Sequence, residues 1–142
     1  MSLDRACTVP ARMSCLPDAI AVIESFCQER GVAAGDALRL SLIVEELFTN
    51  TVTHGYRGDS DAPVRIALGA NASEVELSYE DAAPPFDPLE HARGSTADLA
   101  GDAPDRPVGR LGIALVTSMA ARIRYARDDG WNRLVVALVR AA

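Results

Sequence analysis

The sequence predicts an α+β fold, a two-layer sandwich with helices on one face of a mixed, mostly antiparallel sheet. Two observations carry this prediction. Apolar residues recur at helical spacing in three segments and alternate with polar residues in several shorter ones. The segments follow the order β-α-α-β-β-loop-α-β-β, and the short turns between neighbouring strands favour antiparallel hairpins. Because 142 residues is the size of one domain, we expect a single domain over residues 1–142.

A short edge strand and a helix are expected at the N-terminal end. Residues 3–12 include Pro10, which is disfavoured in a central strand because proline has no amide proton to donate. Apolar residues at helical spacing then predict a helix from Leu16 to Glu29, and Gly31 fits the end of this helix.

The second helix is the most strongly patterned part of the chain. We expect it to start after Gly35, with Asp36 as its N-cap, and to end near His54 or Tyr56. Its apolar stripe must face a core, and this stripe comprises Leu40, Ile43, Val44 and Leu47.

A polar stripe lies beside the apolar one. Because a helix advances about 100° per residue, Glu46, Asn50 and His54 share one side of it. A carboxylate and an amide oxygen on the flank of a buried helix suit an oxygen-ligated Mg²⁺ and an activated hydroxyl group. Taken alone, the segment favours a solvated helix side that ends at Gly55 as its C-cap, with Asn50 simply tolerated.

Turn chemistry separates the second helix from a predicted antiparallel hairpin. Residues 57–63 read Arg-Gly-Asp-Ser-Asp-Ala-Pro and are rich in turn formers. A Gly/Asn connection at residues 69–73 joins two alternating strands. One face of this hairpin is expected to be buried through Val64, Ile66, Leu68, Val75, Leu77 and Tyr79.

The C-terminal part begins with a long segment that lacks periodicity. Residues 82–107 contain five prolines and two glycines, and a loop of that length within a compact domain is typical of a lid or a binding loop. A helix is expected from Gly109 to Ala121. A hairpin with strands at 123–125 and 134–139, turned at residues 128–130, completes the fold.

The composition excludes several classes of function. A net charge of −6 argues against non-specific binding of nucleic acid. The charge is uneven, since residues 1–105 carry 7 Arg and 18 acidic residues, whereas residues 106–142 carry 7 Arg and 2 acidic residues. Every basic residue is Arg, which excludes mechanisms that need a lysine, such as a P-loop or a Schiff base.

The cysteines and the hydropathy pattern favour an intracellular location. Cys7, Cys15 and Cys27 are odd in number and lack metal-ligand or redox spacing, so we expect reduced thiols in or near the core. No apolar run is long enough to span a bilayer, and no signal peptide follows Met1. We therefore expect a cytoplasmic protein without a membrane partner.

Two further motifs flank the long loop. Asp81 ends a strand and is followed by a turn of small residues that includes Ala83 and leads to Phe86. Gly109 and Gly112 open the last helix, where exposed amide groups and the helix dipole favour phosphate oxygens. Each motif alone is ordinary, because aspartate is a common turn former and glycine permits close helix packing.

In this order, the polar helix stripe, the strand-end carboxylate and the glycine pair resemble the GHKL ATPase superfamily (gyrase, heat-shock chaperone, histidine kinase, MutL). The resemblance is closest to its branch of small bacterial anti-sigma-factor serine/threonine kinases. It covers nearly the whole chain, from about Leu16 to Val139, including the closing strand pair from Arg124 to Leu134. It implies the Bergerat ATPase fold.

The resemblance also implies a role for each motif residue. Glu46 resembles the general base that acts on the attacking hydroxyl group. Asn50 resembles the residue whose side-chain oxygen coordinates the Mg²⁺ that bridges the ATP phosphates. Asp81 resembles the carboxylate that accepts a hydrogen bond from the adenine amino group, and Ala83 and Phe86 belong to the nucleotide-binding turn that follows it.

The phosphate-binding glycine box of the family corresponds to Gly109, Arg110, Leu111 and Gly112, and residues 88–108 resemble the ATP lid. Two positions depart from the family pattern. Arg110 replaces a common glycine, and its guanidinium either pairs with a phosphate or points to solvent. Ala83 replaces the last glycine of an Asp-x-Gly turn and adds a methyl group near the nucleotide.

These expectations converge on a serine/threonine protein kinase of a bacterial partner-switching system that uses ATP and Mg²⁺. The resemblance implies a STAS-type anti-anti-sigma factor as substrate, a sigma factor as a further partner and a possible homodimer, without direct nucleic-acid contact. The alternative is a non-catalytic switch module in which nucleotide only shapes the lid. Glu46 and Asn50 favour the enzyme, whereas Ala83 and Arg110 favour the module. A domain cut from a sensor histidine kinase fits less well, because no phosphoacceptor-histidine helix pair precedes residue 36.

Overall fold

The computed structural model of the protein describes residues 1–90 and 110–141, apart from the side chains of residues 110–113 and 115. The strands are β1 (Arg5–Pro10), β2 (Pro63–Ala70), β3 (Glu74–Asp81), β4 (Arg122–Asp128) and β5 (Trp131–Val139). The α-helices of the described part are α1 (Leu16–Glu29), α2 (Ala34–Asn50) and α4 (Arg110–Met119). A 3₁₀ turn, Met13–Cys15, precedes α1, and a π-helical turn, Thr51–Gly55, follows α2.

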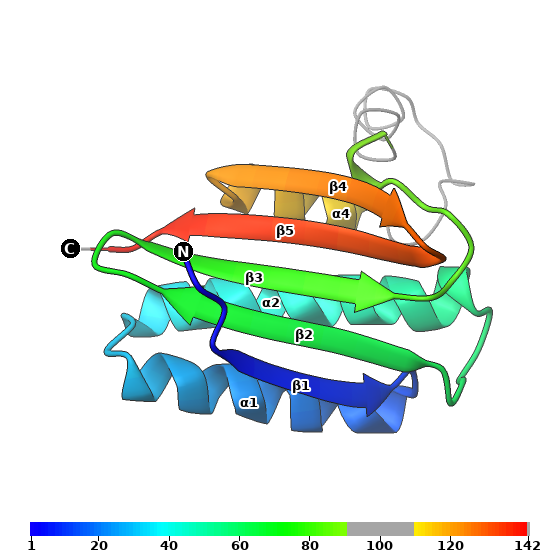
Figure 1. The fold of residues 1–142 in the computed structure, drawn as a ribbon, viewed down its shortest axis with the longest axis horizontal. Coiled ribbons are helices and arrows are strands. Elements are labelled where there is room, and N and C mark those ends of the chain that lie inside the picture. Colours follow the sequence, from blue (N-terminus) through cyan, green and yellow to red (C-terminus); the bar gives the residue numbers. More distant parts are fainter. Residues whose placement is uncertain (91–109, 142) are drawn as a thin grey trace.

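The five strands form one sheet in the order β1-β2-β3-β5-β4, and the helices cover one of its faces (Figure 1). This arrangement confirms the predicted two-layer α+β sandwich. All four pairings between described strands are antiparallel, so the parallel pair of a mixed sheet is not found among them. Pro10 lies on an edge strand, as expected from its missing amide proton.

The core lies between the sheet and the helices. Alternate residues of β2, β3 and β5 face the helices, and α1 and α2 turn their apolar stripes toward them. The residues predicted to be inward on the second helix and on the first hairpin are all buried. The largest fully buried side chains include Ile23, Phe26, Leu40, Ile43, Phe48, Ile66, Leu68, Leu77 and Leu138.

The prediction for the start of α2 was wrong. The helix begins at Ala34, with Ala33 at the N-cap position and no side-chain capping bond. Asp36 instead lies in the first turn and is fully buried. Its carboxylate accepts hydrogen bonds from the backbone amide of Ala141 and from Arg39 Nη1, both at 2.7 Å. A contact with the C-terminal end of the chain therefore outweighs the local capping preference of aspartate.

The end of α2 has an unusual geometry. The π-helical turn after Asn50 is closed by a bond of 2.9 Å from the Tyr56 amide to the Thr51 carbonyl. The helical path thus ends near Tyr56, as predicted, but Gly55 is not its cap. Arg57 is the residue with a left-handed backbone, at φ 58°, and the next amide, that of Gly58, donates to the Val52 carbonyl at 2.7 Å.

Candidate functional site

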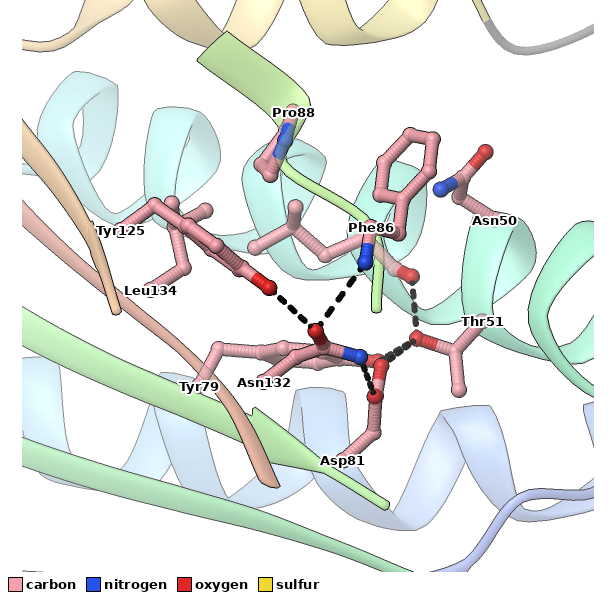
Figure 2. A pocket seen from close by; sticks show the side chains of 10 residues that line it. Asn50, Thr51, Tyr79, Asp81, Phe86, Pro88, Tyr125, Asn132 and Leu134 are labelled. Carbon is pink, nitrogen blue, oxygen red and sulfur yellow. Dashed lines mark hydrogen bonds between the residues drawn. The ribbon is translucent and has the colours of Figure 1, made fainter. Parts of the chain in front are cut away.

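A cavity lies on the helix-covered side of the sheet, between the C-terminal end of α2 and the ends of β3 and β5 (Figure 2). It consists of two adjoining hollows, with volumes of about 30 Å³ and about 170 Å³. The residues that line both hollows are Asn50, Thr51, Asp81, Phe86 and Asn132. Two of the predicted motifs, the polar stripe of α2 and the strand-end carboxylate, therefore meet at one place.

Asp81 is the charged group at the centre of this cavity. It is the last residue of β3, and the alternation of that strand turns it inward together with Leu77 and Tyr79, so that it is 8% exposed. Its Oδ1 accepts hydrogen bonds from Asn132 Nδ2 at 2.8 Å and from the Ala83 amide at 3.2 Å. Its Oδ2 accepts one from Thr51 Oγ1 at 2.8 Å. The carboxylate is thus held in place by three donors.

These three donors leave room for a fourth. An ionised carboxylate offers about four acceptor directions, two on each oxygen. In the described residues Oδ2 receives only the Thr51 hydroxyl, so one direction on this oxygen is open to a donor from a ligand. The amino group of adenine is such a donor. A carbonyl oxygen at the same place, as in guanine, would face a carboxylate without a proton between them.

The hydroxyl groups of Tyr79 and Thr51 orient the hydrogen bond that Asp81 Oδ2 accepts. Tyr79 Oη lies 2.7 Å from Thr51 Oγ1, which in turn lies 2.9 Å from the Leu47 carbonyl. Burial raises the pKa of Tyr79 well above its usual value, so the phenol stays protonated. Because the Thr51 hydroxyl donates to other acceptors, the phenol is the donor in the bond between Tyr79 and Thr51. Thr51 has a single proton, and it is shared between the Leu47 carbonyl and Asp81 Oδ2.

Asn132 joins Asp81 to the turn that follows it. It lies on the inward face of β5, 8% exposed, and its Nδ2 also donates to the carbonyls of Ala83 at 3.2 Å and Pro84 at 3.1 Å. Its Oδ1 accepts from Tyr125 Oη at 2.5 Å and from the Phe86 amide at 3.1 Å (Figure 2). Burial raises the pKa of Tyr125, which keeps this phenol a donor.

Thr51, Tyr79 and Asn132 were not predicted as site residues. The signal for Asn132 is present in the sequence, because an amide stands at an inward position of a strand whose other inward positions are apolar. Tyr79 shares the inward face of β3 with Asp81 in the same way. Thr51 directly follows Asn50 at the end of α2, and both side chains line the cavity.

Ala83 is accommodated without strain. It is 2% exposed, its carbonyl accepts a bond of 2.7 Å from Arg127 Nη1, and among the described residues positive φ outside glycine is confined to Arg57 and Asp129. A Cβ placed on Gly55 would come within 3.0 Å of the Ala83 Cβ. The glycine thus leaves the space that the alanine methyl group occupies, and the turn does not need glycine for its backbone conformation.

The predicted stripe of α2 is brought to the cavity only in part. Asn50 and His54 line the larger hollow, and neither side chain has a hydrogen bond or ion pair with another described residue. Glu46 is half-buried one helical turn before Asn50 and does not belong to the described lining of either hollow. Its assignment as a general base stays a prediction.

The predicted phosphate-binding box and the predicted lid lie largely outside the described residues. Gly109 and residues 91–108 are not among the described residues. For Arg110, Leu111 and Gly112 the structure gives only the backbone of the first turn of α4. Of the predicted lid, residues 88–90 are helical, and Pro88 is buried against the smaller hollow.

One side chain of the cavity wall is a suitable ligand for the expected Mg²⁺. No group of three or more His, Cys, Asp or Glu side chains able to hold a metal ion occurs in the described ranges. Asn50 offers an amide oxygen at the cavity wall that has no partner among the described residues. Mg²⁺ commonly takes one or two protein ligands and completes its shell with phosphate and water. No helix in the described part of the chain is long and apolar enough to cross a membrane.

The family model of the histidine kinase-like ATPase domain matches residues 9–138. The chain belongs to this family, and the predicted resemblance to the GHKL ATPases and their anti-sigma-factor kinase branch is confirmed.

Curated relatives of this chain are kinases. The chain is 28% identical over 97 residues to the serine/threonine-protein kinase BtrW of Bordetella bronchiseptica, covering 68% of this chain and 66% of the relative. It is 26% identical over 93 residues to the serine-protein kinase RsbW of Listeria monocytogenes, covering 64% and 59%. The matched regions thus span less than two thirds of the length of both relatives.

Solved structures share the fold. The RsbU and RsbW domains of a Mycobacterium tuberculosis protein match with a TM-score of 0.65 and 14% identity, over 98% of this chain and 34% of that one. The SiaB-SiaC complex from Pseudomonas aeruginosa matches with a TM-score of 0.65 and 13% identity, over 96% and 89%. The catalytic domain of the histidine kinase ThkA matches with a TM-score of 0.54 and 9% identity, over 96% and 98%.

Proposed function

We propose that the protein binds ATP with Mg²⁺ in this cavity and transfers the γ-phosphoryl group to a serine or threonine of a protein partner. The observation that carries this proposal is the geometry of Asp81. Among the described residues, the buried carboxylate accepts three hydrogen bonds and has one open acceptor direction, and it faces a cavity whose α2 wall carries Asn50, a side chain with no hydrogen bond to another described residue. Such a cavity favours a ligand with an amino group at one end and a metal-bound anion at the other.

Each step of the proposed reaction needs a group that the chain supplies. Asn50 would hold Mg²⁺ through its side-chain oxygen. The bound ion would supply neutralisation of the charge on the phosphate oxygens. Glu46 would accept the proton of the partner's hydroxyl as this oxygen bonds to the γ-phosphorus and the bond to the bridging oxygen of ADP breaks. Since the transition state is loose, positioning and charge neutralisation are the main requirements.

The expected partner is a STAS-type anti-anti-sigma factor, in a system where phosphorylation decides which protein is bound. The names of the relatives as serine-protein kinases support this proposal, and so does a fold neighbour solved as a two-protein complex. A sigma factor as a second partner and a homodimeric state belong to the same proposal and rest on the family resemblance alone.

A second candidate is a non-catalytic module whose partner binding depends on nucleotide. The observation that favours it is the position of Glu46 outside the described cavity lining. Incubation with γ-labelled ATP, Mg²⁺ and a STAS protein encoded near this chain separates the two functions. The kinase proposal expects label on a serine or threonine of the partner. Nucleotide-dependent binding of the partner without any label would favour the module.

A further inference from the structure

The two ends of the cavity differ in how their polar groups are satisfied. At the sheet end, Asp81, Thr51 and Asn132 bond to one another and to the backbone. At the α2 end, the larger hollow is lined by Asn50, His54 and Arg57, none of whose side chains has a hydrogen bond or ion pair within the described residues. Unpartnered polar groups that gather on one wall are the groups available to a ligand.

Arg57 stands out among these three because it is a full positive charge. It is the one arginine in the described lining of this cavity. The nearby Arg127 already donates to the Ala83 carbonyl at 2.7 Å. A guanidinium group has five N–H donors in a planar fork, an arrangement that matches two oxygens of one phosphate.

The backbone of Arg57 adds an independent observation. The residue is left-handed, at φ 58°, and occupies the position after the helical path where the following amide bonds back to the Val52 carbonyl. Glycine is the residue that best tolerates this position, because it has no Cβ to clash. The backbone conformation therefore does not account for an arginine at this position, and its side chain is exposed at the rim of the larger hollow.

We propose that Arg57 binds the phosphate groups of the nucleotide and makes the cavity prefer phosphorylated adenine ligands over adenosine. This inference rests on the proposed ATP binding and adds to it a phosphate-binding residue from the α2 side. It is separate from the glycine box at the start of α4. In this arrangement Asp81 recognises the adenine base, and Arg57 recognises the negatively charged phosphate groups of the same nucleotide.

Calorimetric titration of the full chain with ATP and ADP, and competition titration with adenosine, test this role. For Arg57→Gly we expect a loss of roughly 5- to 50-fold in affinity for ATP and ADP, since one charged contact is removed. Adenosine affinity should stay within about twofold of wild type, because the base contacts are unchanged. Arg57→Lys keeps the charge but loses the planar fork, so its ATP affinity should lie between those of Arg57→Gly and wild type. Thermal unfolding of Arg57→Gly should occur at or above the wild-type midpoint.

Two control variants separate the guanidinium from other effects. Asp129→Gly relieves the other left-handed non-glycine backbone of the described chain, at φ 51° and outside the cavity lining. Arg124→Gln removes one positive charge from the face of the sheet opposite the helices. Both should bind ATP as wild type does.

Equal ATP affinities for Arg57→Gly and wild type would overturn the role of Arg57 alone. An equal loss for adenosine and ATP would do the same, because it would point to a displaced helix end. If wild type binds no ATP at all, the proposed function fails, and this inference fails with it.

Discussion

Five hydrogen bonds converge on the side-chain amide of Asn132. They connect the carboxylate of Asp81, the backbone of residues 83–86 and the phenol of Tyr125. A buried amide whose donors and acceptors are all hydrogen-bonded stabilises the fold only while every partner stays in place. At the scale of single residues, the cavity is therefore shaped by an amide that does not itself need to touch the ligand.

Replacement of Asn132 by leucine tests this role. Asn132→Leu keeps a side chain of similar size but leaves a buried carboxylate oxygen, a phenol and a backbone amide short of partners. We expect a loss of about 2–4 kcal/mol in the free energy of unfolding. Urea unfolding measures it. The neighbouring Arg133→Leu changes an exposed position on the other face of β5 and should cost less than about 1 kcal/mol.

At the scale of elements, the end of α2 determines what faces the cavity. A regular helix would continue the stripe from Asn50 to His54 with constant spacing. The π-helical turn from Thr51 to Gly55 adds one residue to the helical turn, and His54 within it lines the cavity together with Asn50 and Thr51. Tyr56 closes the turn, and its Oη accepts a bond of 3.1 Å from the Ala82 amide, which ties α2 to the residue after Asp81.

Substitutions of Glu46 and Asn50, the two predicted functional residues of α2, should affect ATP affinity and phosphoryl transfer differently. Glu46→Gln keeps the shape and the hydrogen-bonding capacity of the side chain but removes the base. ATP affinity should be retained, while phosphoryl transfer to the partner should fall by about 10²–10⁴-fold. Single-turnover transfer and calorimetric ATP titration measure the two quantities.

Asn50→Ala is the companion variant, because it removes the proposed metal ligand from the cavity wall. It should weaken ATP binding in the presence of Mg²⁺ and slow transfer together. Its affinity for ATP in EDTA should equal that of wild type. Transfer by Glu46→Gln at the wild-type rate would show that Glu46 is not the base.

At the scale of the whole molecule, the C-terminal end holds the two layers together. Arg140 Nη1 donates to the Asn71 carbonyl at 2.6 Å, and its Nη2 donates to the carbonyls of Arg30 at 3.1 Å and Gly31 at 3.0 Å. The next residue bonds to the buried Asp36. The end of α1, the β2–β3 turn and the start of α2 are thus joined by the last described residues.

Removal of this connection should lower stability without touching the cavity. Arg140→Met keeps the aliphatic stem but leaves three backbone carbonyls without their donor, for which we expect a loss of roughly 1–3 kcal/mol in unfolding free energy. ATP affinity should stay within about twofold of wild type. Chemical unfolding combined with one calorimetric titration measures both. A stability equal to wild type would contradict the structural role of Arg140.

The order of elements was predictable because apolar periodicity is local in the sequence. The helix at Leu16–Glu29 and both hairpins follow from it directly. The position of Asp36 was not predictable, since its partner Ala141 is far away in sequence. The same reason explains the missed cavity residues. Thr51, Tyr79 and Asn132 lie on three different elements, and only the folded sheet brings them to Asp81.

The central claim is that Asp81 recognises the amino group of adenine. The most direct test compares wild type with Asp81→Asn, using one ligand that has this amino group and one that lacks it. Asp81→Asn preserves the shape of the side chain, but it removes the negative charge and replaces one of the two carboxylate oxygens by an NH₂ group, which cannot accept a hydrogen bond. ATP affinity should fall by about 10- to 100-fold, the value of a charge-assisted hydrogen bond in a desolvated site. Purine riboside triphosphate, which lacks the amino group, should bind wild type and Asp81→Asn about equally. If both proteins bind ATP with the same affinity in calorimetric titration, Asp81 does not recognise adenine and the assignment of this cavity is contradicted.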